Sequence, residues 1–212
     1  MATLITDRDK KIIKHMEQYK YATLEHIQKI FFREQANSYN IARRRMAAIR
    51  EAGYVKCERD PALNRLVYWY NDKGIKMPSR HRLIVLDVLA ELHYMGCNIL
   101  NFDIEKQWMG GKVRSDAFMV FALRNTRCHY FVEVCTSHND LNLEKYDKLL
   151  ATDEVHKYIG RKVNPRVLCI TDRMPDAGVI QLRHTQAVFI DSRLNDFSII
   201  IQPPSEMLKT LG

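Results

Sequence analysis

The feature that most constrains the fold is a change in the spacing of apolar residues within the first 70 positions. Three successive segments carry apolar residues every three to four positions, which predicts helices. Two segments rich in Val, Tyr and Trp follow at 54–59 and 65–70, which predicts strands joined by a turn at 60–64. Three helices followed by a hairpin is the element order of a winged helix-turn-helix.

Capping residues locate these three helices. Thr6, with an Asp three positions later, predicts a capping box at the start of the first helix. Thr23 is the expected cap of the second helix. Either Asn37 or Ser38 begins the third helix, and Gly53 is expected to end it in a left-handed conformation.

The third helix has a basic, polar side. Its apolar residues, Ile41, Ala42, Met46 and Ile49, predict a buried face and leave the polar side chains exposed. In the DNA major groove, Arg can pair with guanine and Asn with adenine, and both Arg and Lys bind phosphate. The expected DNA-contacting residues are Ser38, Tyr39, Asn40, Arg43, Arg44 and Arg50 on this helix, and Lys56, Arg59 and Arg65 on the hairpin. The alternative is a three-helix interaction module whose Arg run is only a solvated surface.

The charge distribution favours the DNA-binding interpretation. Residues 1–78 hold 16 Lys and Arg against 9 Asp and Glu, a net charge of +7, whereas residues 79–212 hold 17 against 16, a net charge of +1. Almost all of the total charge of +8 therefore lies in the first third of the chain. A basic segment of this kind favours a polyanionic partner.

Residues 79–212 show the pattern of a mixed α/β domain around one sheet. An antiparallel meander followed by a helical crossover would place Asp116 and Glu133 on neighbouring strands near their ends. The expected helices are 80–94, 143–158 and 176–184, and the expected strands are 98–105, 116–123, 130–135, 166–171, 187–191 and 197–201.

Six segments of the chain carry a family resemblance: RDKKIIKHMEQYKYATLEHIQKIFF, ARRRMAAIREAGYV, RHRLIVLDVLAEL, KVRSDAFMVF, HYFVEVCT and LEKYDKLL. Together, over about residues 6–150, they resemble the replication-relaxation proteins of plasmids and mobile elements. The resemblance implies a winged helix-turn-helix followed by a domain similar to the restriction-endonuclease-like fold. We therefore expect an α/β (α+β) protein with a DNA-binding domain at 1–78 and a nuclease-like domain at 79–212.

The nuclease-like domain matches the catalytic pattern of that fold only in part. In active members an acidic residue on one strand and a Glu-x-Lys on the next hold a divalent metal, and Asp116 and Glu133 match these two acids. Cys135 stands where the Lys belongs, and a neutral thiol cannot replace an ammonium group. We expect a non-catalytic domain without a cofactor. The alternative is a metal-dependent endonuclease or nickase in which Asp116 and Glu133 hold Mg²⁺ and Lys145 or Lys148 supplies the ammonium.

These observations lead to one expected function. We expect a double-stranded DNA-binding protein of a plasmid, phage or other mobile element, acting as a homodimer in replication, DNA transfer or transcriptional control. The five scattered cysteines and the short apolar runs predict a cytoplasmic protein without a membrane partner. Nucleotide-binding glycine loops and hydrolase motifs are missing from the sequence, and we expect no small-molecule ligand. A pure interaction scaffold is a third possibility, disfavoured by the basic first third.

Overall fold

The computed structural model describes residues 4–61, 64–135, 141–175 and 177–202. The chain forms two compact units, Met1–Met95 and Gly96–Gly212, which we call unit 1 and unit 2. Helices and two β-sheets make up the structure, so the expected mixed α/β class is confirmed. Within the described ranges, every helix is too short or too polar to cross a membrane.

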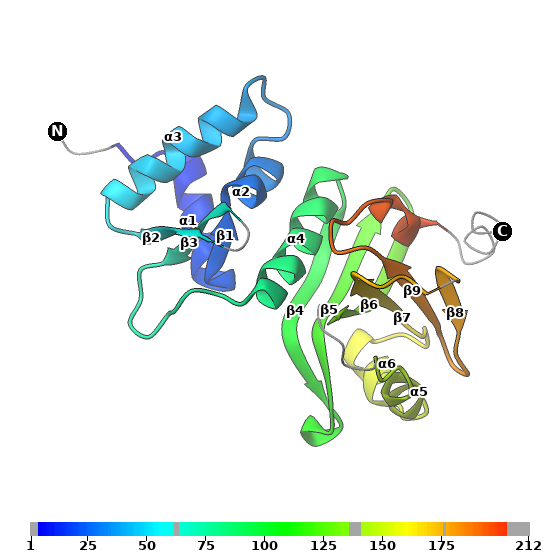
Figure 1. Ribbon diagram of the computed structural model, residues 1–212. Coiled ribbons are helices and arrows are strands. Elements are labelled where there is room, and N and C mark those ends of the chain that lie inside the picture. The colour runs from blue at the N-terminus through cyan, green and yellow to red at the C-terminus, as the bar shows by residue number, and fades with distance from the viewer. Residues whose placement is uncertain (1–3, 62–63, 136–140, 176, 203–212) are drawn as a thin grey trace. The chain divides into compact units, whose positions relative to one another are not determined.

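Unit 1 contains four helices and one small antiparallel sheet among its described residues (Figure 1). The sheet has the strand order β1-β3-β2, and the expected hairpin forms its β2 and β3. The strand β1, which the sequence analysis missed, adds to β3 with Ala22 opposite Tyr68. The elements are α1 (Asp7–Tyr19), β1 (Tyr21–Thr23), α2 (Leu24–Phe31), α3 (Ser38–Glu51), β2 (Val55–Asp60), β3 (Arg65–Tyr70) and α4 (Arg80–Tyr94).

The first three helices begin directly after the residues that the sequence predicts as their caps. Thr6 and Asp9 form a capping box at the start of α1, and Thr23 forms a second one with His26 at the start of α2. Asn37 precedes α3, and Gly53 follows it with a φ of 83°. The two capping boxes satisfy backbone N–H groups that the helix starts would otherwise leave without partners, whereas the Asn37 side chain makes no such bond.

The two units meet in sequence at Met95 and Gly96, later than the expected boundary at 78. The reason is that α4 interacts with α2 and β3. Glu91 of α4 forms an ion pair with Lys29 of α2. One residue of α4, Asp87, accepts hydrogen bonds from both His26 of α2 and Arg65 of β3. Partners so distant in the chain leave no local pattern in the sequence.

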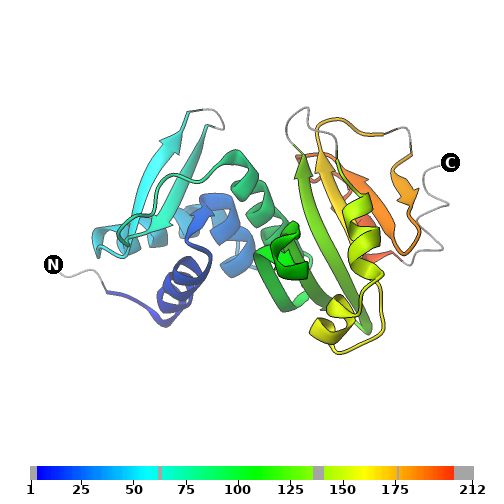
Figure 2. The same ribbon diagram turned by 90° about the horizontal axis from the view of Figure 1, so that it is seen from below.

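Unit 2 is built on a six-stranded sheet with the order β4-β5-β6-β7-β9-β8. The first three strands form an antiparallel meander, and β6, β7 and β9 are parallel. Two helices, α5 and α6, connect β6 to β7 and lie against one face of the sheet (Figure 2). The elements are β4 (Asn98–Trp108), η1 (Met109–Gly111), β5 (Val113–Leu123), β6 (Thr126–Cys135), α5 (Glu144–Leu150), α6 (Glu154–Ile159), β7 (Arg166–Thr171), β8 (Val179–Gln181), β9 (Gln186–Ile190) and η2 (Phe197–Ile201).

Three of the expected elements in unit 2 are wrong. The helix expected at 143–158 is two helices, because the Thr152 hydroxyl donates to the Leu149 carbonyl and accepts from the Glu154 amide, which turns the chain. In place of the helix expected at 176–184 lies the strand β8, paired with β9; Asp176 itself is outside the described residues. The strand expected at 197–201 is the 3-10 helix η2, whose Ile200 carbonyl accepts from the Tyr130 hydroxyl rather than from a neighbouring strand.

Candidate functional site

The exposed side of α3 carries the candidate DNA-binding residues of unit 1. Ala42, Met46 and Ile49 are completely buried, as expected, whereas Ile41 is only half-buried. Arg43 and Arg44 are exposed, Arg44 opposite the buried face and Arg43 on its flank. The other exposed candidates on this helix are Tyr39, Asn40 and Arg50.

Arg45 has a structural role that separates it from the other two members of the Arg run. Its Nε donates to Oδ1 of Asp9 at 2.9 Å, and its Nη2 donates to Oδ2 of the same carboxylate. Asp9 is completely buried. Burial alone would raise the pKa of Asp9, but hydrogen bonds from Arg45 and Thr6 outweigh it and lower that pKa. Arg45 therefore ties α3 to α1 and leaves Arg43 and Arg44 as the exposed pair.

Some of the other expected DNA contacts have partners inside unit 1. Ser38 accepts a hydrogen bond from the Gln28 amide at 2.9 Å. Arg65 donates to Asp87 at 3.2 and 3.3 Å, so it links the hairpin to α4. Arg59 lies on the exposed side of β2 and donates to the Asn64 side chain at 2.6 Å. Lys56, also on β2, is exposed.

In unit 2 the carboxylates of Asp116 and Glu133 lie on neighbouring strands, as expected. The regular pairing of β5 with β6 ends at Ala117 and Val132. Beyond that pair, Oδ2 of Asp116 accepts the backbone N–H of Val134 at 2.8 Å. The Asp116 side chain thus takes the place of a backbone partner where β5 and β6 separate. We call this end of the two strands, with the carboxylates of Asp116 and Glu133, the carboxylate fork.

Lys145 of α5 reaches the fork. Its Nζ lies 2.8 Å from a carboxylate oxygen of Glu133, which also accepts a hydrogen bond from the Tyr146 hydroxyl. Glu133 is only 8% exposed, and this burial raises its pKa, although Lys145 and Tyr146 act in the opposite direction. Lys148 is exposed, and in the described part of the chain no hydrogen bond or ion pair joins it to either carboxylate. The ammonium beside Glu133 therefore comes from Lys145.

The cysteines at the fork are thiols. Burial raises the pKa of Cys135, and the neighbouring Glu133 and Asp116 raise it further because they disfavour a second negative charge. The same two causes, burial first and then Glu133, raise the pKa of Cys169 on β7. A protonated thiol is a poor metal ligand.

The side chains at the fork do not fit a resident divalent metal well. Among the described residues the fork has the carboxylates of Asp116 and Glu133, and Glu133 is already bound by Lys145 and Tyr146. In residues 4–61, 64–135, 141–175 and 177–202, no group of three His, Cys, Asp or Glu side chains has a metal-binding arrangement. The arrangement suits a buried, hydrogen-bonded ion pair more closely than an Mg²⁺ site with several oxygen ligands.

Comparisons of the chain with protein families, curated proteins and solved structures gave no match. The functional argument therefore rests on the residues and geometry described above.

Proposed function

We propose that the protein binds double-stranded DNA through α3. One observation carries the proposal: Arg43 and Arg44 are exposed on α3 outside its buried face, while Arg45 is held by Asp9. The charge of +7 on residues 1–78 supports it, because each phosphate contact releases counterions from DNA.

In this proposal unit 1 is a winged helix-turn-helix. Helices α2 and α3 form the helix-turn-helix, and the hairpin β2–β3 is the wing. The N-terminal half of α3, with Asn40, Arg43 and Arg44, enters the major groove, where these side chains can bind base edges or phosphates. Lys56 and Arg59 on the wing bind the flanking backbone.

The test compares two double variants with the same change of charge. Arg43→Ala with Arg44→Ala should weaken binding to duplex DNA at least tenfold, measured by fluorescence anisotropy. Lys11→Ala with Lys14→Ala removes two exposed positive charges from α1 of the same unit and should change the affinity less than threefold. Equal losses in the two variants would mean that only net charge matters, and α3 would not be the interface.

We assign unit 2 to the restriction-endonuclease-like fold on its element order. An antiparallel meander, a helical crossover and a parallel fourth strand are the features that support this assignment. With the six resembling segments, it supports a protein of the replication-relaxation type, carried by a plasmid, phage or other mobile element and acting in the cytoplasm in replication, DNA transfer or transcriptional control.

Cleavage of DNA is the second candidate function, and one observation favours it: Lys145 brings an ammonium to Glu133, in the role that Cys135 cannot fill. The poor fit of the fork to a metal argues against it. We therefore expect the purified protein to leave its own genomic locus uncut in Mg²⁺ or Mn²⁺. Cutting that Asp116→Asn and Glu133→Gln both abolish, with DNA affinity unchanged, would establish the nuclease instead. Cutting that appears only in Cys135→Lys would mean that the carboxylates still suit a metal and only the lysine was lost.

Dimerisation is part of the proposal. Helix-turn-helix proteins commonly read two half-sites as a dimer, and the net charge of +1 on residues 79–212 gives little repulsion between copies. Analytical ultracentrifugation with duplex DNA should show two chains per site. Only monomers at micromolar concentration, with and without DNA, would refute the dimer.

A further inference from the structure

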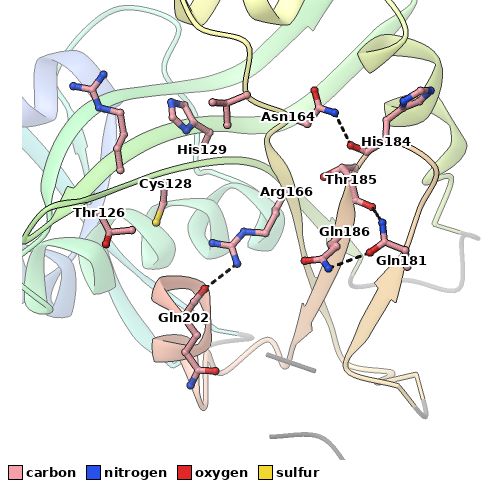
Figure 3. Close-up of a pocket in the computed structure, with 12 residues that line it drawn as sticks. Thr126, Cys128, His129, Asn164, Arg166, Gln181, His184, Thr185, Gln186 and Gln202 are labelled. Atoms are coloured by element: carbon pink, nitrogen blue, oxygen red, sulfur yellow. Dashed lines mark hydrogen bonds between the residues drawn. The ribbon is translucent and has the colours of Figure 1, made fainter. Parts of the chain in front are cut away.

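Unit 2 has two adjoining hollows that share the side chains of Arg127 and His129. The larger, of about 550 Å³, lies where β6, β7 and β9 begin (Figure 3). The smaller, of about 400 Å³, is lined by residues of β4, β5 and α6. We call the two hollows together the divided groove. The larger hollow has the volume of an ordinary small-molecule site.

The divided groove is lined by positive and neutral side chains. Arg127 and Arg166 contribute two guanidinium groups, and His129 and His184 contribute two imidazoles. Among the described residues that line either hollow, none is Asp or Glu. The guanidinium of Arg166 already donates two hydrogen bonds, to the carbonyls of Gln202 and Ile200, both at 3.1 Å. Arg127 is exposed, so its guanidinium is accessible to a ligand. An anionic ligand fits this lining.

His129 is the unusual residue of the divided groove. It is only 7% exposed and lines both hollows, yet its ring has no hydrogen bond to another residue in the described part of the chain. Burial lowers its pKa, and the nearby Arg127 and Arg161 lower it further because they disfavour a third positive charge. Because this unpartnered imidazole lines both hollows, a ligand there can form hydrogen bonds with it.

The larger hollow also presents a hydrogen-bond acceptor without a donor. Nε2 of Gln181 donates to the Thr185 carbonyl at 3.1 Å, and Nε2 of Gln186 donates to Oε1 of Gln181 at 3.0 Å (Figure 3). This chain of amides leaves Oε1 of Gln186 buried with no partner among the described residues. Once the Gln186 side chain turns toward the hollow, a planar ligand with an N–H group, such as a nucleobase with an exocyclic amine, would satisfy this oxygen.

The smaller hollow adds exposed apolar surface beside the same two cationic residues. Leu100 is 43% exposed and Tyr158 is 44% exposed, and both line it. A phosphate at Arg127 and His129 would therefore have a polar hollow on one side and a partly apolar hollow on the other. A nucleotide unit combines an anion with a flat, hydrogen-bonding ring in this way.

We propose that the divided groove binds a nucleotide, with its phosphate at Arg127 and His129 and its base in the larger hollow against Gln186. The source is either a free nucleotide or one unit of a single strand that continues into the smaller hollow. The groove is separate from the carboxylate fork, because His129 and Glu133 are four residues apart on β6, roughly 13 Å along an extended strand. It also stands independently of DNA binding by α3.

The first experiment follows the His129 imidazole by NMR of ¹⁵N-labelled histidine. Deoxyadenosine 5′-monophosphate should shift its signals, raise its pKa because the phosphate favours the imidazolium, and bind with a submillimolar Kd. Inorganic phosphate and deoxyadenosine should each bind at least tenfold more weakly. Unmoved His129 signals, or phosphate binding as tightly as the nucleotide, would overturn the proposal.

Substitutions in the divided groove test the phosphate contact and the base contact separately. Arg127→Ala should weaken nucleotide binding at least tenfold, whereas Arg124→Ala, an exposed Arg outside the groove on the same hairpin, should leave it unchanged. Gln186→Leu should weaken the nucleotide but not inorganic phosphate, because it removes the acceptor for the base and leaves Arg127 and His129 in place. Equal effects of Arg127→Ala and Arg124→Ala would contradict the assignment of the phosphate.

A dA₁₂ oligonucleotide tests whether the bound nucleotide is free or part of a single strand. The experiment uses the Arg43→Ala, Arg44→Ala variant, in which binding by α3 is removed. Tighter binding of dA₁₂ than of the mononucleotide, still sensitive to Arg127→Ala, supports a single strand. Binding of the mononucleotide alone supports a free nucleotide. Failure of both ligands to move His129 refutes the divided groove, while the duplex affinity of the wild type tests α3 separately.

Discussion

At the scale of single residues, Asp9 shows how a buried charge is accommodated in unit 1. Its carboxylate completes the capping box with Thr6 and accepts two hydrogen bonds from Arg45. The cap was predictable because its partners are three positions apart. The ion pair was not, because residues 9 and 45 lie on different helices and no local spacing connects them.

Replacing Arg45 with Met should lower the free energy of unfolding by about 2 kcal/mol, since the buried Asp9 carboxylate would lose its charged partner. Urea denaturation at pH 7 measures this loss. The control is Arg44→Met, a change of the same size at an exposed position, which should alter stability by less than about 0.5 kcal/mol. Similar losses in the two variants would contradict the structural role of Arg45.

The lowered pKa of Asp9 also predicts the pH at which this stabilisation disappears. A carboxyl group whose pKa is lower in the folded than in the unfolded state stabilises the fold fully above its unfolded pKa, near 4. The contribution is lost as the pH falls from there through the folded pKa. Acid should therefore reduce the stability difference between wild type and Arg45→Met, and a difference that stays constant from pH 7 to pH 2.5 would contradict the account.

At the scale of elements, α5 is the part of unit 2 that completes the carboxylate fork. It brings both Lys145 and Tyr146 to Glu133. Tyr146 is completely buried, and its ring lies 4.6 Å from that of Phe131, which fixes the helix against the sheet. From the sequence, either Lys145 or Lys148 could supply the ammonium group at the carboxylates. The orientation of α5 on the sheet turns Lys145, and not Lys148, toward Glu133.

Removing the Lys145 ammonium should raise the pKa of Glu133 further above its usual value, because the charge that favours the carboxylate is lost. The side-chain carboxyl signal of Glu133, followed by NMR as a function of pH in Lys145→Met, measures the change. Lys148→Met is the control on the same helix and should leave the titration of Glu133 unchanged, because Lys148 is exposed and its charge is screened. A titration of Glu133 unaffected by Lys145→Met would show that the pair does not form in solution.

Elements with strong local signals were predicted well, and those decided by distant contacts were not. The helix Arg80–Tyr94 and the strand Arg166–Thr171 have the expected bounds. By contrast, the β-branched residues of 197–201 favour a strand locally, yet the segment forms η2, whose Ile200 carbonyl accepts from Arg166 and Tyr130. Periodicity also fails for runs as short as β8, which has three residues.

At the scale of the whole molecule, composition predicted one of the two proposed binding sites but not the other. The concentration of positive charge in residues 1–78, together with the apolar pattern of α3, led to the expected DNA-binding helix from the sequence alone. The divided groove left no such signal, and the sequence analysis expected no small-molecule ligand. Its lining comes from separate segments, with Arg127 and His129 on β6 and Gln186 on β9, which only the sheet order brings together.

The salt dependence of duplex binding tests the central claim most directly. A plot of log Kd against log salt concentration, measured between 50 and 200 mM salt, has a slope of roughly 0.9 for each phosphate contact. If Arg43 and Arg44 both contact phosphates, their double substitution by Ala should reduce the slope by about 1.8 while Lys11→Ala with Lys14→Ala leaves it unchanged. A slope for the Arg43→Ala, Arg44→Ala variant equal to that of the wild type, with equal affinity, would show that α3 does not bind DNA.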